Sequence, residues 1–152
     1  MNRTDYPARH DIDHGAVVVV PWRAEWEATF ARDAALLRRL LPDDDEVRDI
    51  YHIGSTSVRG LAAKPIVDML LVVRSIDAFD ARRAVLEAAG FVWCGAPIAG
   101  GRYLYAMHAT VDGGGGGGVR CHLHVAPAPL SDRSRAVLRF RDALRASAAL
   151  RD

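Results

Sequence analysis

The sequence predicts one α/β domain of the α+β type, in which helices pack mainly on one side of a mixed β-sheet. Segments of strand and helix character follow one another in the order β-α-β-β-α-β-β-β-α. The 152 residues, of which 50% are hydrophobic and 26% charged, suit a single globular domain. We expect residues 1–15, which are polar and lack periodicity, to form a mobile arm, and residues 16–152 to form the domain.

Six segments are predicted to be strands because they are short and rich in β-branched or alternating apolar residues. They cover residues 17–20, 47–53, 66–73, 91–93, 102–107 and 119–125. Seven of the eight residues in 66–73 are apolar, which is typical of a strand buried on both faces. Asp68 is the exception. Because burying an unpaired carboxylate is costly, we expect Asp68 to bind a metal ion or to pair with another group.

Three helices are predicted from apolar residues at helical spacing. The first covers residues 21–41, and its tryptophans are interpreted as packing residues. The second covers residues 77–89 and ends at Gly90. The third begins at Ser131. The residues of the third helix that we expect to face the core are Val137, Leu138, Phe140, Leu144 and Ala148.

The composition argues against several classes of protein. A net charge of +1 predicts no strong attraction to nucleic acid or to a membrane surface, and no apolar run is long enough to span a bilayer. Two cysteines without metal-type spacing, and no secretory signal, favour a cytoplasmic location. The acidic run at 43–46 is interpreted as solvated. The glycines at 113–118 are interpreted as a flexible hairpin tip, because a phosphate loop needs a helix behind it.

A cluster of polar residues follows the second predicted strand. Gly54 can adopt a positive φ and lets the backbone approach a ligand closely. Ser55, Thr56 and Ser57 supply hydroxyls that can cap a helix start, where free N–H groups attract phosphate. Lys64 is the single lysine of the chain and adds a positive charge. An ordinary turn followed by a solvated lysine is the alternative interpretation.

The last predicted strand places Arg120, His122 and His124 on one face, because side chains alternate along a strand. Two histidines at i and i+2 can both reach one metal ion. His52, which lies close to the polar turn in sequence, strengthens this interpretation. Hydrogen-bonded histidines on a half-exposed sheet are the alternative, and both interpretations stay open.

The stretch HIGSTSVRGLAAKPIVDMLL resembles the signature of the GrpB-like family, a group within the DNA polymerase β-type nucleotidyltransferase superfamily. The resemblance extends over residues 17–150. It implies a nucleotidyltransferase-like fold in which Gly54 and Ser55 hold a triphosphate and Asp68 binds Mg²⁺ or Mn²⁺. In that superfamily two metal ions activate the attacking hydroxyl and neutralise the leaving pyrophosphate.

The sequence departs from this superfamily pattern at two places. Leu70 occupies the position of a second acid, and His122 and His124 stand on the strand that should supply a third. One carboxylate with two imidazoles suits Zn²⁺, Mn²⁺ or iron better than Mg²⁺.

Three functions therefore stay open. The first is nucleotidyl transfer to a small acceptor, with Asp68 and Lys64 as the catalytic residues. The second is a non-catalytic module that binds a nucleotide or another phosphorylated small molecule. For this module the resemblance implies a link to coenzyme A metabolism, because some relatives are fused to dephospho-coenzyme A kinase. The third is a transition-metal enzyme that uses His52, Asp68, His122 and His124. Without a metal, an anion would be held by Lys64, Arg102, Arg120 and the histidines.

Overall fold

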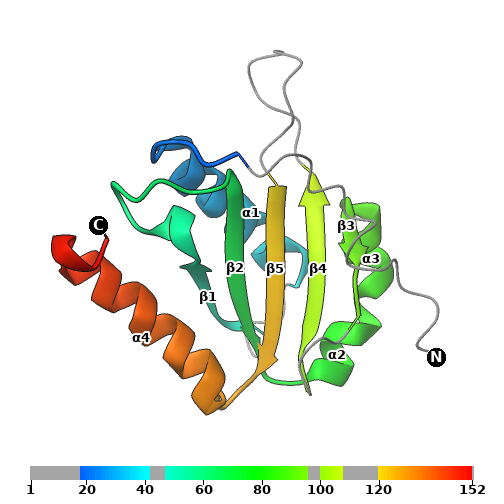
Figure 1. Ribbon diagram of the computed structural model, residues 1–152. Coiled ribbons are helices and arrows are strands. Elements are labelled where there is room, and N and C mark those ends of the chain that lie inside the picture. Colours follow the sequence, from blue (N-terminus) through cyan, green and yellow to red (C-terminus); the bar gives the residue numbers. More distant parts are fainter. Residues whose placement is uncertain (1–17, 42–46, 96–99, 108–119, 152) are drawn as a thin grey trace.

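The computed structural model describes residues 18–41, 47–95, 100–107 and 120–151. Within these residues the chain forms a five-stranded sheet with helices on both faces (Figure 1). The predicted N-terminal arm, the acidic run and the glycine-rich tip lie outside the described residues. In the described part, no helix combines the length and apolar character needed to cross a membrane.

The sheet is mixed, as the sequence predicts. Its strands are β1 (Val47–Ile53), β2 (Ile66–Val73), β3 (Phe91–Trp93), β4 (Arg102–Met107) and β5 (Arg120–Pro127). They lie in the order β1-β2-β5-β4-β3, with β2 parallel to β5 and all other neighbours antiparallel. The apolar strand β2 is therefore enclosed by strands on both sides. The register places Asp68 between Ile53 of β1 and His122 of β5.

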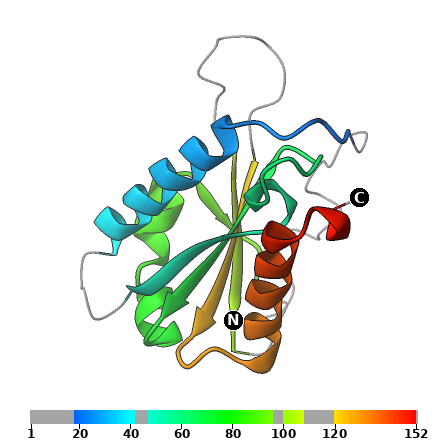
Figure 2. The same ribbon diagram turned by 90° about the vertical axis from the view of Figure 1, so that its left-hand side faces the viewer.

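Most of the helices lie on one side of the sheet, which confirms that part of the prediction (Figure 2). The helices on that side are α1 (Glu25–Leu40), α2 (Ile76–Ala81) and α3 (Arg83–Ala88), whereas α4 (Asp132–Ala146) lies on the other. The main core fills the space under α1, α2 and α3, where Trp26, Phe79 and Leu86 are fully buried with Met69 of β2. Two short 3₁₀ helices, η1 (Ser55–Ser57) and η2 (Ala148–Leu150), complete the described elements.

Two N-terminal predictions were wrong. In the described part of segment 17–20, Val20 forms a single bridge with Ala63 and no strand is present. The first helix begins at Glu25 and not at residue 21. Tertiary contacts explain both differences. The bridge and a hydrogen bond from Trp22 Nε1 to the Thr56 carbonyl (3.2 Å) hold this segment against the η1 turn.

The predicted helix over 77–89 is two helices, α2 and α3. They are separated at Arg82, where φ is −89° and ψ is 3°. The Arg82 N–H donates to the carbonyl of Phe79 (3.0 Å), and the Arg82 carbonyl accepts from Val85 (3.0 Å). These three-residue spacings tighten the backbone and change the helix direction.

The prediction for the last helix was also wrong in part. Helix α4 has no buried residue, and Val137 and Phe140 are 38% and 68% exposed. Leu138 packs against a small apolar cluster formed by Ile53, Leu70 and Val72. The side chains of Asp68, His122 and His124 share this face of the sheet and leave little apolar surface for α4 to cover.

Candidate functional site

The η1 turn and Asp68 are packed directly against each other. Gly54 has φ of 70° and ψ of −179°, a backbone conformation that is accessible almost exclusively to glycine. A Cβ added to Gly54 would lie 2.5 Å from Oδ2 of Asp68 and 3.1 Å from its Cγ. The glycine is therefore required twice, once for the backbone conformation and once for the space that the carboxylate occupies.

The hydroxyls of Thr56 and Ser57 build the turn. Thr56 Oγ1 donates to the carbonyl of Ile66 (2.9 Å), and Ser57 Oγ donates to the carbonyl of Gly54 (2.6 Å). Both side chains are buried. Ser55 is exposed, and within the described residues its hydroxyl has no hydrogen-bond partner. Of the three predicted phosphate-binding hydroxyls, the structure leaves that of Ser55 available.

His52 does not lie with Asp68. It is opposite Met69 in the register and stacks on Phe30 of α1, with ring centroids 4.9 Å apart. Because the Thr56 hydroxyl already donates its hydrogen to a carbonyl, His52 Nε2 is the donor in their 3.1 Å contact. Burial, followed by the positive charge of Arg145, lowers the pKa of His52 to about 4. His52 is therefore a neutral residue on the α1 side of the sheet.

Asp68, His122 and His124 do converge, as predicted. Asp68 Oδ1 lies 3.3 Å from Nδ1 of His122 and 3.7 Å from Nε2 of His124. Burial by itself raises the pKa of the Asp68 carboxyl, but its interactions with the two imidazoles outweigh burial and lower that pKa. The carboxylate is thus held in its charged form by two histidines on the neighbouring strand.

The Nε2 atom of His122 is buried, and no group among the described residues forms a hydrogen bond with it. Since Nδ1 of this ring faces the carboxylate, the neutral tautomer carries its lone pair at Nε2. Tyr103 packs edge-on against His122 and also contacts His124, with centroid distances of 5.5 and 5.1 Å. No sequence pattern singles out Tyr103, and its register opposite His124 places it in this cluster.

The position two residues after Asp68 cannot hold a metal ion. Leu70 is 4% exposed and belongs to the apolar cluster with Ile53 and Val72. Among the described residues, no three side chains of His, Cys, Asp or Glu form a set that could hold a metal. The described residues by themselves therefore do not form a complete cage for Zn²⁺ or another transition metal.

The predicted basic residues are dispersed. Arg102 Nε donates to Oδ1 of Asp80 on α2 (2.8 Å), and its Nη1 donates to the carbonyl of Gly101 (2.8 Å), so its guanidinium is tied to the other side of the sheet. Lys64 is exposed just before β2. The backbone of Arg120 pairs with Ile66, and its side chain lies outside what the structure describes.

Two arginines of α4, which sequence reasoning missed, hold the turn from outside. Arg141 Nη1 donates to the carbonyl of His52 (3.0 Å), and Arg145 Nε donates to the carbonyl of Ser57 (2.9 Å). They are spaced four residues apart on one helix face. That spacing was the available signal, but their partners are 89 and 88 residues away in sequence.

The fold places the chain in the nucleotidyltransferase-like class of structures. It superposes on the Cid1 poly(U) polymerase bound to MgGTP with a TM-score of 0.56 and 19% identity, covering 88% of this chain and 41% of Cid1. At this level of identity the similarity concerns the fold.

The chain belongs to the GrpB family, described as "GrpB protein", whose family model matches residues 16–152. The crystal structure of the conserved protein GrpB from Enterococcus faecalis is 30% identical, with a TM-score of 0.73, and the match covers 87% of this chain and 74% of that one. UPF0157 protein YqkA of Bacillus subtilis (strain 168) is 34% identical over 131 residues, which are 86% of this chain and 35% of YqkA. Glutamate-rich protein GrpB of Alkalihalophilus pseudofirmus is 30% identical over 104 residues, which are 66% of this chain and 58% of that protein. The chain thus spans about one third to three fifths of these two relatives.

Proposed function

We propose that this domain binds a nucleotide or a related phosphorylated small molecule, together with a divalent ion, beside Asp68 and the η1 turn. We rest this on the close packing of Gly54 against Asp68, which sets the exposed Ser55 next to the one carboxylate on this face of β2. Lys64 is exposed in the segment that enters the same end of β2. A turn, a carboxylate and a lysine at one end of a nucleotidyltransferase-like sheet support phosphate binding.

The residues present suit a divalent ion that binds together with the ligand, and not one that the protein binds by itself. Mg²⁺ is commonly held by one or two carboxylates together with the phosphates of a substrate. Asp68 is ionised and would supply the carboxylate, and the ion would neutralise the charge of the phosphates there. Ser55 and Lys64 would hydrogen-bond the phosphate oxygens directly.

Binding without nucleotidyl transfer is the form of this function that the geometry supports best. Transfer by two metal ions requires acids that hold both ions. Here Leu70 is buried under α4, and one oxygen of Asp68 already faces two imidazoles. Transfer remains the alternative, and release of pyrophosphate would reveal it.

Isothermal titration calorimetry with ATP, UTP and coenzyme A, each with and without Mg²⁺, tests the proposal. We expect saturable binding of at least one of them that is stronger with Mg²⁺, and at least tenfold weaker Mg²⁺-dependent binding by Asp68→Asn. Asp77→Asn is the matched control, because Asp77 is exposed on α2 and loses the same charge.

Three results would count against the proposal. They are absence of binding of all three ligands at millimolar concentration, an equal loss in Asp77→Asn, and release of pyrophosphate by the wild-type protein. The third result would replace binding alone by nucleotidyl transfer.

A further inference from the structure

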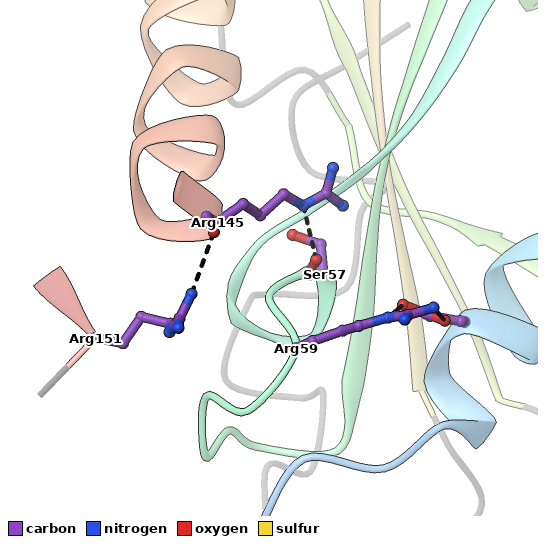
Figure 3. Close-up of a pocket in the computed structure, with 5 residues that line it drawn as sticks. Ser57, Arg59, Arg145 and Arg151 are labelled. Carbon is purple, nitrogen blue, oxygen red and sulfur yellow. Dashed lines mark hydrogen bonds and ion pairs between the residues drawn. The ribbon is translucent and has the colours of Figure 1, made fainter. Parts of the chain in front are cut away.

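A polar pocket that is not lined by Asp68 lies where the η1 turn meets α1 and the C-terminal end of α4 (Figure 3). Its volume is about 400 Å³, within the range of small-molecule sites. The residues that line it are Glu27, Ser57, Arg59, Arg145 and Arg151. Every one of these side chains is polar or charged, so the pocket does not suit an apolar or aromatic ligand group.

One arginine of the pocket is neutralised within the protein. Arg59 donates from Nε and Nη2 to the two carboxylate oxygens of Glu27, at 2.7 and 2.8 Å. This hydrogen bonding lowers the pKa of Glu27, so the carboxylate is charged at neutral pH. Figure 3 shows the side chain of Arg59 extending toward α1.

The other two arginines bond only to backbone carbonyls in the part of the chain that the structure describes. Arg145 Nε donates to the carbonyl of Ser57 (2.9 Å). Arg151 Nη1 donates to the carbonyls of Leu144 (3.0 Å) and Arg145 (3.2 Å). Neither guanidinium contacts a carboxylate among the described residues, so no ion pair within that part of the chain neutralises their two positive charges.

The backbone contacts also fix where these charges point. Each guanidinium carries five N–H donors, and the contacts described use the Nε–H of Arg145 and the Nη1 group of Arg151. Burial, followed by repulsion from the nearby charge of Arg141, lowers the pKa of Arg145. The surroundings of Arg145 thus disfavour its positive charge. An anion in the pocket would relieve that repulsion and would occupy the remaining donors.

We propose that this pocket binds a small, polar, phosphate-bearing molecule through Arg145 and Arg151, with Arg59 at its rim. Guanidinium groups match phosphate oxygens in pairs, and two of them facing one pocket suit a dianionic phosphate. The pocket shares Ser57 with the η1 turn, but it includes none of Ser55, Lys64 and Asp68, which are proposed to bind the nucleotide and its metal ion. It therefore stands or falls independently of Asp68.

Pyrophosphate, titrated calorimetrically into the full chain in low-salt buffer with EDTA, is the probe. We expect one saturable site per chain, at least tenfold weaker binding in Arg145→Gln/Arg151→Gln, and several-fold weaker binding in each single variant. Arg139→Gln is the matched control, because it removes the same charge from an exposed position on α4. Circular dichroism establishes that each variant is folded.

A conservative variant tests whether weaker binding reflects the lost donors and not a loss of structure. Arg145→Lys keeps the charge and can still donate to the Ser57 carbonyl but loses the paired donors, so we expect intermediate affinity and an unchanged melting temperature. The proposal is overturned if the wild-type chain does not bind pyrophosphate, or if Arg139→Gln weakens binding as much as the double variant. It is also overturned if Asp68→Asn abolishes this metal-free binding while the double variant retains it, since the anion would then lie at the other site.

Discussion

Gly54→Ala tests the packing of the η1 turn against Asp68. An alanine at φ of 70° and ψ of −179° is strained by about 1–3 kcal/mol. Its Cβ would also lie 2.5 Å from Oδ2 of Asp68, and such overpacking costs about 1–3 kcal/mol more. The expected loss is therefore about 2–6 kcal/mol, which lowers the melting temperature by on the order of 10 °C for a chain of this size. Urea denaturation and thermal melts measure both quantities.

Two further variants separate the strain from the clash. Gly60 has φ of 83°, but a Cβ there would meet nothing within 4 Å, so Gly60→Ala carries strain alone and should cost less. In Gly54→Ala/Asp68→Ala the clash with the carboxylate is gone, and we expect a favourable coupling of about 1–2 kcal/mol between the two sites. Strictly additive losses, or equal losses at Gly54 and Gly60, would refute the contact between turn and carboxylate.

Three more predictions follow from the same structure. Folding lowers the pKa of His52 to about 4, so between pH 4 and 6.5 the unfolded chain binds more protons than the folded one. The stability that neutral His52 contributes is therefore complete above pH 6.5, and about 3 kcal/mol of it is lost as the pH falls to 4. Urea denaturation of His52→Gln at several pH values should lack this dependence. Arg102→Ala should lower the free energy of unfolding by about 0.5–1 kcal/mol, because it breaks the ion pair with Asp80, and should leave Mg²⁺-nucleotide binding unchanged. Weaker binding in calorimetry would instead show that Arg102 contributes to the nucleotide site. Leu138→Ala should cost about 1–2 kcal/mol, whereas Phe140→Ser should change stability by less than about 0.5 kcal/mol in urea melts; the reverse order would contradict the orientation of α4.

The strands of the sheet were predictable because their signal is local. The bounds predicted for β1, β2, β3 and β4 agree with the structure, and those of β5 differ by at most two residues. The apolar pattern of each strand reports its own burial. Helix α4 shows the limit of this reasoning, because Phe140 has the spacing of a core residue but faces away from the small apolar cluster.

The candidate site was predictable in part. The cluster of Asp68 with His122 and His124 followed from the alternation of side chains along one strand and from the motif around Gly54. His52 could have joined this cluster if the other face of β1 had packed against α1. The sequence of β1 does not decide which face packs there. The direction of Arg102 likewise depended on the position of Asp80 on a packed helix.

By itself the sequence determined the strands, the glycine turn and the identity of the one acid in β2, because hydrophobic periodicity and glycine conformation are properties of short segments. Only the tertiary structure decided which side chains meet. It separated His52 from Asp68 by placing them on opposite faces of the sheet, and it joined Arg145 to Ser57 across 88 residues. The physical reason is that a binding site forms where packed elements converge, and packing depends on the surfaces of distant segments and not on local sequence alone.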